Sequence, residues 1–127
     1  MGSSIKSFTD LEVWQKARNV KNQIYSICKN LPVDEKYNLN LQMKKAAVSL
    51  TANIAEGYGR FHYQENIQFL RTSRGSAYEL LDHIMTCVDQ KYISIELADE
   101  INDQLINCIG LIDGLIRYLN NQKNRKS

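Results

Sequence analysis

The chain has 127 residues, 43% hydrophobic content and a single proline, which is typical of one compact domain that buries about two-thirds of its unfolded surface. Its three cysteines are odd in number and widely separated, so they fit neither a disulfide framework nor a zinc site. The sequence has no basic-then-apolar leader, and no apolar run approaches the roughly 20 residues of a membrane span. We therefore expect a cytoplasmic protein without a membrane partner.

Charge is distributed unevenly along the chain, although the formal net charge is only +2. Residues 1–75 carry 11 Lys or Arg against 6 Asp or Glu, whereas residues 76–119 carry 2 against 8. Such a chain can present one basic and one acidic surface, which suits an anionic partner or head-to-tail self-association. The alternative is that the charges only solvate the outer faces of helices.

Apolar residues recur at three- and four-residue spacing in four segments, and this periodicity predicts an all-α chain. The expected helices cover about residues 9–31, 37–56, 62–91 and 95–119. A capping box at Thr9 and Glu12 begins the first helix, and Gly57 is expected in a left-handed conformation at the end of the second.

Short connections make neighbouring helices antiparallel, which predicts an up-down-up-down four-helix bundle. The bundle is expected to be a single domain over residues 1–127. Residues 1–8 and 120–127 are expected to be flexible ends, because polar termini of this kind commonly fray.

A narrow polar stripe follows the second expected helix between two apolar edges. On a helical wheel of about 100° per residue the stripe contains Gln42, Lys45, Ser49, Asn53 and Glu56. A helix with apolar side chains on both edges is expected to be packed on two sides. The stripe should then be satisfied internally, because an unpaired buried polar group costs about 1–3 kcal/mol.

The third expected helix offers a partner for this stripe. Arg74 falls within its apolar arc, where a guanidinium is expected only with a counter-ion. We expect Arg74 to pair with Glu56, with Arg60 or Arg71 as second choices for the carboxylate. The pair can be interpreted as an active-site carboxylate with an arginine clamp or as a buried ion pair that fixes helix register. The structural interpretation is favoured, because no nucleophile accompanies the pair.

Aromatic and basic side chains alternate along one side of the first expected helix. This candidate nucleic-acid site contains Trp14, Arg18, Lys21 and Tyr25, and Lys44 and Lys45 of the second helix extend it. Aromatic rings stack on unpaired bases, and Arg and Lys neutralise phosphates. The alternative is that the two aromatic residues lie at the boundary of the core or in a subunit interface, since interfaces are also rich in Trp, Tyr and Arg.

Sequence motifs of most enzyme classes are missing: the chain has no P-loop, no C-x-x-C and no H-E-x-x-H. The segment NIAEGYGR (53–60) has two glycines, but they follow a helix, so no helix N-terminus faces this loop to hold a phosphate. We expect a protein that is not an enzyme and has no cofactor, no metal and no small-molecule substrate.

Three segments carry a family resemblance: FTDLEVWQKA (8–17), IYSICKNLPVDEKYNLNLQMKKAAVSLTANIAEGYGR (24–60) and QFLRTSRGSAYEL (68–80). They resemble the four-helix-bundle family named after proteins encoded by intervening sequences in bacterial 23S rRNA genes, whose members are also described as small ribosomal proteins. The resemblance covers nearly the whole chain. It implies a homo-oligomeric ring, expected to be a pentamer, without catalytic residues.

A related bundle serves as an accessory factor in diversity-generating retroelements, where its basic surface engages nucleic acid and a reverse transcriptase. By analogy the resemblance implies RNA binding. We therefore expect a non-enzymatic oligomeric bundle that binds RNA, or a ribonucleoprotein, through a basic face. The alternative is a protein–protein scaffold or accessory subunit without nucleic-acid affinity.

Overall fold

The computed structural model describes residues 7–126, and every regular element in this range is helical. In chain order the elements are η1 (Phe8–Asp10), α1 (Glu12–Lys29), η2 (Val33–Glu35), α2 (Leu39–Tyr58), α3 (Tyr63–Asp89) and α4 (Ile95–Lys126), where η denotes a short 3-10 helix. The all-α prediction is confirmed for the described residues.

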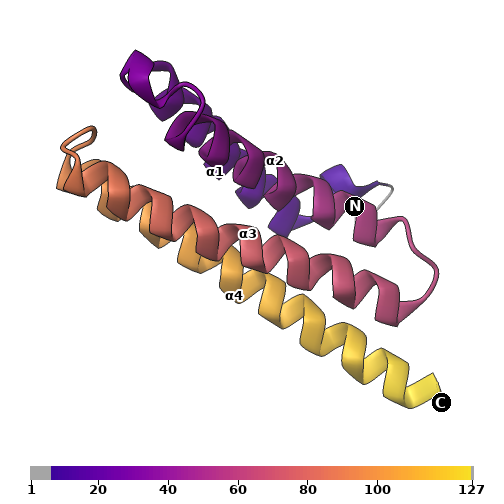
Figure 1. Ribbon diagram of the computed structural model, residues 1–127. Helices are drawn as coiled ribbons and strands as arrows, with labels where there is room; N and C mark the ends of the chain where they lie inside the picture. Colours follow the sequence, from indigo (N-terminus) through magenta and orange to yellow (C-terminus); the bar gives the residue numbers. More distant parts are fainter. Residues whose placement is uncertain (1–6, 127) are drawn as a thin grey trace.

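The four long helices lie side by side in a bundle in which each helix has two neighbours (Figure 1). Helix α2 contacts α1 and α3, and α4 contacts α3 and α1. Short loops connect successive helices, so each helix runs opposite to the one before it. The predicted up-down-up-down four-helix bundle is therefore confirmed.

Aliphatic side chains at helical spacing fill the core, as the periodicity predicts. On α1, for example, Val13, Ala17, Val20 and Ile24 are buried in succession. The three cysteines are free and buried among these side chains. Burial raises the pKa of the Cys87 and Cys108 thiols to about 11, because the charged thiolate is disfavoured away from water.

The capping box at the start of the bundle forms two residues earlier than predicted. The Ser7 hydroxyl accepts from the backbone N–H of Thr9, and the Asp10 carboxylate accepts from the backbone N–H of Ser7. The chain then makes the single turn η1 before α1 begins at Glu12. The ring of Phe8 lies edge-to-face on Trp14 at 5.2 Å, which holds η1 against α1.

Helix α4 extends past residue 119, where the fourth helix was predicted to end, and includes residues 120–126 of the end whose flexibility stays a prediction. Helix α4 continues to Lys126 because it still has a neighbour there: the Lys123 Nζ donates to Gln64 Oε1 in the first turn of α3 at 2.8 Å. At the other end only Ser7 and Phe8 of the predicted flexible segment 1–8 are described, and Phe8 already belongs to η1. Residues 1–6 and 127 lie outside the described residues.

Gly57 lies inside α2 and does not end it. No glycine among the described residues has a positive φ, so the predicted left-handed conformation is wrong. A Cβ at Gly57 would lie 2.6 Å from Asn66 Oδ1 and 3.2 Å from Phe69 Cβ, both in α3. The absence of a side chain at Gly57 therefore allows α3 to approach α2 closely.

Hydroxyl groups join α2 to α3 further along the bundle. The buried Ser73 Oγ donates to the carbonyl of Leu50 at 2.6 Å, and the Ser76 Oγ donates to Ser49 Oγ at 2.7 Å. The Asn53 side-chain amide in turn donates to the Ser49 carbonyl at 2.8 Å. These contacts give Ser49 and Asn53 of the predicted polar stripe hydrogen-bond partners within the protein.

The rest of the predicted stripe faces solvent, because within the described chain no helix covers the side of α2 that is turned away from α1 and α3. Gln42, Lys45 and Glu56 are exposed, in contrast to Ser49 and Asn53 beside α3. The prediction that the whole stripe is enclosed is therefore wrong.

The predicted ion pair between Arg74 and Glu56 does not form. The Arg74 Nη1 donates to Asp113 Oδ1 of α4 at 2.6 Å, and Glu56 pairs with Arg60 one turn further along at 3.1 Å. Arg74 lies on the side of α3 that faces α4, whereas Glu56 belongs to α2. The second choice, Arg60, is the actual partner of Glu56. The Arg74 and Asp113 side chains are 35% and 38% exposed, so the pair is not buried.

We predict that Gly57→Ala destabilises the protein by about 1–3 kcal/mol, because the new methyl group overpacks the contact with Asn66 and Phe69. Gly75→Ala is the matched control: its Cβ would have no neighbour within 4 Å, so it should leave stability unchanged or raise it by about 0.5–1 kcal/mol. Chemical unfolding measures both variants. Equal stabilities for the two would contradict the close-packing role of Gly57.

We predict that Arg74→Met lowers the free energy of unfolding by less than about 1 kcal/mol, since a half-exposed ion pair contributes little. Asp113→Asn, which removes the other charge of the same pair, should have an effect of the same size. A loss of about 3 kcal/mol or more in urea unfolding would show that the pair behaves as a buried one.

Candidate nucleic-acid interface

The aromatic and basic stripe of α1 lies along its seam with α2. Two contacts fix how these antiparallel helices are aligned: the Asn40 Nδ2 donates to the Cys28 carbonyl at 2.8 Å, and the Lys44 Nζ lies 5.7 Å from the centre of the Tyr25 ring. This alignment places Trp14, at the other end of α1, level with the last turns of α2. We call this surface the α1–α2 seam, defined by Trp14, Arg18, Lys21, Tyr25 and Lys44.

Each aromatic ring of the α1–α2 seam has a cation over it. The guanidinium carbon of Arg18 lies 5.6 Å from the centre of the Trp14 ring, in the same way as Lys44 lies over Tyr25. Trp14 is partly buried and packs against the core, and Tyr25 is 36% exposed. Trp14 thus lies at the core boundary, as one of the two interpretations expected, and its ring also supports a surface cation.

The cations of this region are free of carboxylate partners. Within residues 7–126, no ion pair involves Arg18, Lys21, Lys44 or Lys45. Lys45 does not join the seam, because it is turned about 100° further around α2 than Lys44. The structure therefore brings five of the six predicted residues together and leaves Lys45 on the outer side of α2.

A shallow hollow of about 510 Å³ lies at the Trp14 end of the α1–α2 seam, between η1 and the end of α2. Its lining consists of Phe8, Ala52, Ala55, Glu56, Gly59 and Arg60. We call it the η1–α2 hollow. It combines an aromatic wall, a floor of small side chains and the Glu56–Arg60 ion pair.

Phe8 is the residue of this region that sequence reasoning missed. It falls in the segment that was predicted to be flexible, and a single 3-10 turn has too few residues to show a periodicity. The Ser7–Asp10 capping box is the signal that could have revealed an ordered turn there.

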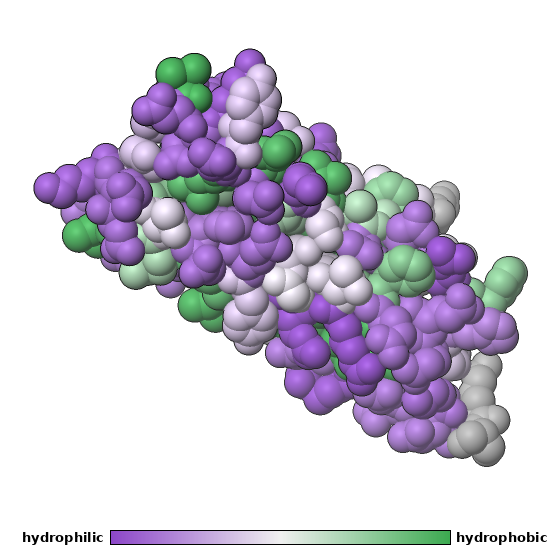
Figure 2. Space-filling view, in the orientation of Figure 1, coloured by the Kyte–Doolittle hydropathy of each residue, from purple (hydrophilic) through white to green (hydrophobic). Residues whose placement is uncertain are grey.

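The outer side of α2 carries an apolar ridge that the described chain leaves uncovered. Leu41 and Val48 are 42% and 45% exposed, and Ala52 continues the same line one turn later. Figure 2 shows hydrophobic side chains in green over the middle of α2, between hydrophilic ones. We call this surface the α2 outer ridge, defined by Leu41, Val48 and Ala52.

A second apolar surface lies along α3 and α4. Tyr78, Met85 and Ile106 are each more than half exposed. The contact between Arg74 and Asp113 aligns these antiparallel helices so that Ile106 lies between the levels of Tyr78 and Met85. We call these three residues the α3–α4 patch. Its surroundings are acidic, with the exposed carboxylates of Asp82, Asp99 and Asp103.

Other kinds of site have less support. A polar groove of about 670 Å³ lies between α1 and α4 and is bridged by Gln23 Nε2, which donates to Gln104 Oε1 at 2.7 Å. In the described part of the chain no three His, Cys, Asp or Glu residues are grouped so that they could hold a metal ion. Among the same residues, no helix is long and apolar enough to span a lipid bilayer.

The fold is similar to that of a solved structure. This structure is of a protein with unknown function from the S23 ribosomal protein family of Bacteroides thetaiotaomicron. The two chains are 22% identical, the match covers 83% of this chain and 95% of that one, and the TM-score is 0.76. At this identity the likeness shows a shared fold.

No curated protein matches the sequence. A family model does: the model described as 23S rRNA-intervening sequence protein matches residues 9–114. This match covers most of the bundle, from η1 into the second half of α4. The chain therefore belongs to the 23S rRNA-intervening sequence protein family.

Proposed function

We propose that this protein is a non-enzymatic, homo-oligomeric bundle that binds RNA, alone or in a ribonucleoprotein, through the α1–α2 seam. The observation that carries the proposal is the pairing of each seam aromatic with an unneutralised cation, Arg18 over Trp14 and Lys44 over Tyr25. Aromatic rings stack on unpaired bases, and free cations neutralise phosphates. RNA with single-stranded loops is the ligand class that uses both features.

The charge distribution of the bundle supports the same surface. The first half of α4 carries the acidic residues Glu96, Asp99, Glu100 and Asp103, whereas Arg117, Lys123 and Arg125 lie in its second half. A polyanion is repelled from this acidic part of α4 and attracted to the α1–α2 seam. The three buried free thiols fit a reducing compartment, and we propose the cytoplasm.

Self-association is proposed from two apolar surfaces with opposite charge around them. The α2 outer ridge has Lys45 beside it, and the α3–α4 patch has Asp82 and Asp99. The two surfaces are different, so a contact between the ridge of one copy and the patch of the next repeats in one direction and closes into a ring when the rotation allows it. The pentamer implied by the family resemblance is the state that we propose.

The alternative function is a protein–protein scaffold or accessory subunit without nucleic-acid affinity. The specific observation in its favour is the exposure of Leu41 and Val48, at 42% and 45%. Contiguous exposed apolar side chains commonly mark surfaces that bind protein. In this case the seam cations would only keep the assembly soluble.

We predict that the protein binds single-stranded fragments of 23S rRNA and that an Arg18→Ala, Lys21→Ala double variant weakens binding at least tenfold. The slope of log affinity against log salt should also fall by about 0.7–0.9 for every phosphate that the variant no longer neutralises. Fluorescence anisotropy at 50–200 mM salt, roughly the range over which phosphate binding weakens most, measures both quantities.

The matched control is an Arg117→Ala, Arg125→Ala double variant, which removes the same charge from exposed positions of α4. It should bind nearly as well as the wild type. Absence of binding at low salt, or equal effects of the two double variants, would rule out the α1–α2 seam as an RNA site.

We predict that light scattering gives a multiple of the protomer mass of 14.7 kDa for the wild type, with the pentamer expected. A Leu41→Glu, Val48→Glu double variant should be monomeric with unchanged helix content, because charged side chains on the ridge oppose burial against another copy. Val33→Glu is the control, since Val33 is 82% exposed and lies outside the ridge. A monomeric wild type, or a ridge variant that still assembles, would overturn the ring proposal.

A further inference from the structure

We propose that the η1–α2 hollow binds one unpaired guanine base of the RNA that follows the α1–α2 seam. This inference rests on the proposed RNA-binding function and adds a base preference to it. Three properties of the hollow support it: its position, the shape of its lining and the chemistry of its ion pair.

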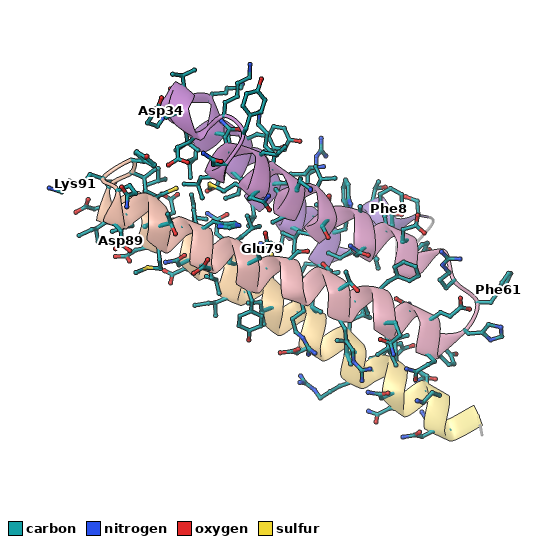
Figure 3. All side chains as sticks on the ribbon, viewed as in Figure 1. Phe8, Asp34, Phe61, Glu79, Asp89 and Lys91 are labelled. Atoms are coloured by element: carbon teal, nitrogen blue, oxygen red, sulfur yellow. The ribbon has the colours of Figure 1, made fainter. Side chains whose placement is uncertain are left out.

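The hollow continues the α1–α2 seam. Phe8, which forms one wall, touches Trp14 edge-to-face at 5.2 Å, and Trp14 lies under Arg18. An RNA strand whose phosphates lie along Lys21 and Arg18 therefore reaches the hollow next to the N-terminal end of α1. Figure 3 shows Phe8 behind the C-terminal half of α2 and Phe61 at the tip of the following loop.

The lining is shaped for a flat ring. Ala52, Ala55 and Gly59 contribute little or no side chain to the lining, and Phe8 contributes its aromatic ring. A volume of about 510 Å³ accommodates a single base, and stacking on an aromatic wall is tolerant of base identity. Shape therefore explains why a base enters the hollow but not which base.

The Glu56–Arg60 ion pair supplies the preference for guanine. Glu56 Oε2 accepts from Arg60 Nη2 at 3.1 Å, and Glu56 Oε1 takes no part in this bond. An ionised carboxylate only accepts hydrogen bonds. Guanine is the base whose Watson–Crick edge presents two adjacent donors, N1–H and the N2 amino group, with the acceptor O6 beside them. A carboxylate next to a guanidinium complements this sequence of donors and acceptor.

The Arg60 guanidinium has two contacts in the absence of a ligand. It lies 4.8 Å from the centre of the Phe69 ring of α3, and it is bonded to Glu56 at 3.1 Å. The Arg60 and Glu56 side chains remain 41% and 58% exposed, so a base can reach both. Binding therefore costs little rearrangement of these side chains. Phe61, which is 98% exposed, offers a second ring to the next nucleotide.

The test uses fluorescence anisotropy of the full chain with short labelled oligouridine strands that contain one guanosine, one inosine or one adenosine at the same position. Inosine lacks the N2 amino group and keeps N1–H and O6. We expect the guanosine strand to bind roughly tenfold more tightly than the inosine strand, the size of effect that the loss of one hydrogen bond to a charged acceptor gives. The adenosine strand should bind no better than inosine.

Variants of single residues test which side chains cause the preference for guanosine. Glu56→Gln keeps the shape of the side chain but should abolish the difference between guanosine and inosine while the salt dependence stays unchanged. Phe8→Leu should weaken all three strands severalfold, because it removes the stacking surface and keeps an apolar contact for Trp14. Glu65→Gln is the control, since this exposed carboxylate of α3 is not part of the hollow lining and should keep the full preference.

The outcomes separate the two proposals. Equal affinity for the three strands, with binding still weakened at least tenfold in the Arg18→Ala, Lys21→Ala variant, would overturn the guanine inference and leave RNA binding by the seam intact. A guanosine preference that survives Glu56→Gln would also overturn it. No binding of any strand at low salt would overturn the proposed RNA-binding function itself. This result is expected if the α1–α2 seam is covered by a protein partner.

Discussion

The close approach of α2 to α3 is the constraint on which the rest of the bundle depends. Gly57 lets Asn66 and Phe69 lie against α2, and the small side chains of Ser73 and Ser76 make hydrogen bonds across the same contact at 2.6 and 2.7 Å. Because one side of α2 packs against α3 and the adjacent side packs against α1, the remaining side faces solvent. The apolar ridge of Leu41 and Val48 is therefore a consequence of how α2 packs.

The same packing separates the charges of the bundle. Arg18, Lys21 and Lys44 of the first half of the chain lie along the α1–α2 seam, and the carboxylates of residues 76–119 lie on α3 and α4. One molecule thus has a basic side for an anionic ligand and an acidic side with its own apolar patch. The proposed RNA binding and the proposed head-to-tail assembly use different surfaces, although Ala52 belongs both to the α2 outer ridge and to the lining of the η1–α2 hollow. A ring whose subunits meet at the ridge would place the seams of successive copies in a repeated array.

The sequence predicts the helices and their buried faces well, because burial itself sets the periodicity of residues such as Val13, Ala17 and Val20. It does not predict the partner of Arg74. A helical wheel gives the direction of a side chain from its own axis, but which helix stands there depends on the packing, and α4 stands beside Arg74. The role of Gly57 is ambiguous for a similar reason, since a glycine near the end of an apolar run fits both a left-handed cap and a close contact.

The candidate site could be predicted in part. Alternation of aromatic and basic residues at helical spacing located Trp14, Arg18, Lys21 and Tyr25 on one surface, and the structure places Lys44 beside them and Lys45 apart. The η1–α2 hollow could not be predicted, because Phe8 and Arg60 are far apart in the sequence and meet only after η1 folds against α2.

The most direct test of RNA binding by the seam is photo-cross-linking of 4-thiouridine-labelled RNA to the intact assembly, with the modified peptides identified by mass spectrometry. If the α1–α2 seam is the RNA site, adducts will concentrate in residues 8–25 and 44–61, around Trp14, Tyr25 and Phe61. Adducts confined to α3 and α4, or an even distribution over the surface, would contradict it.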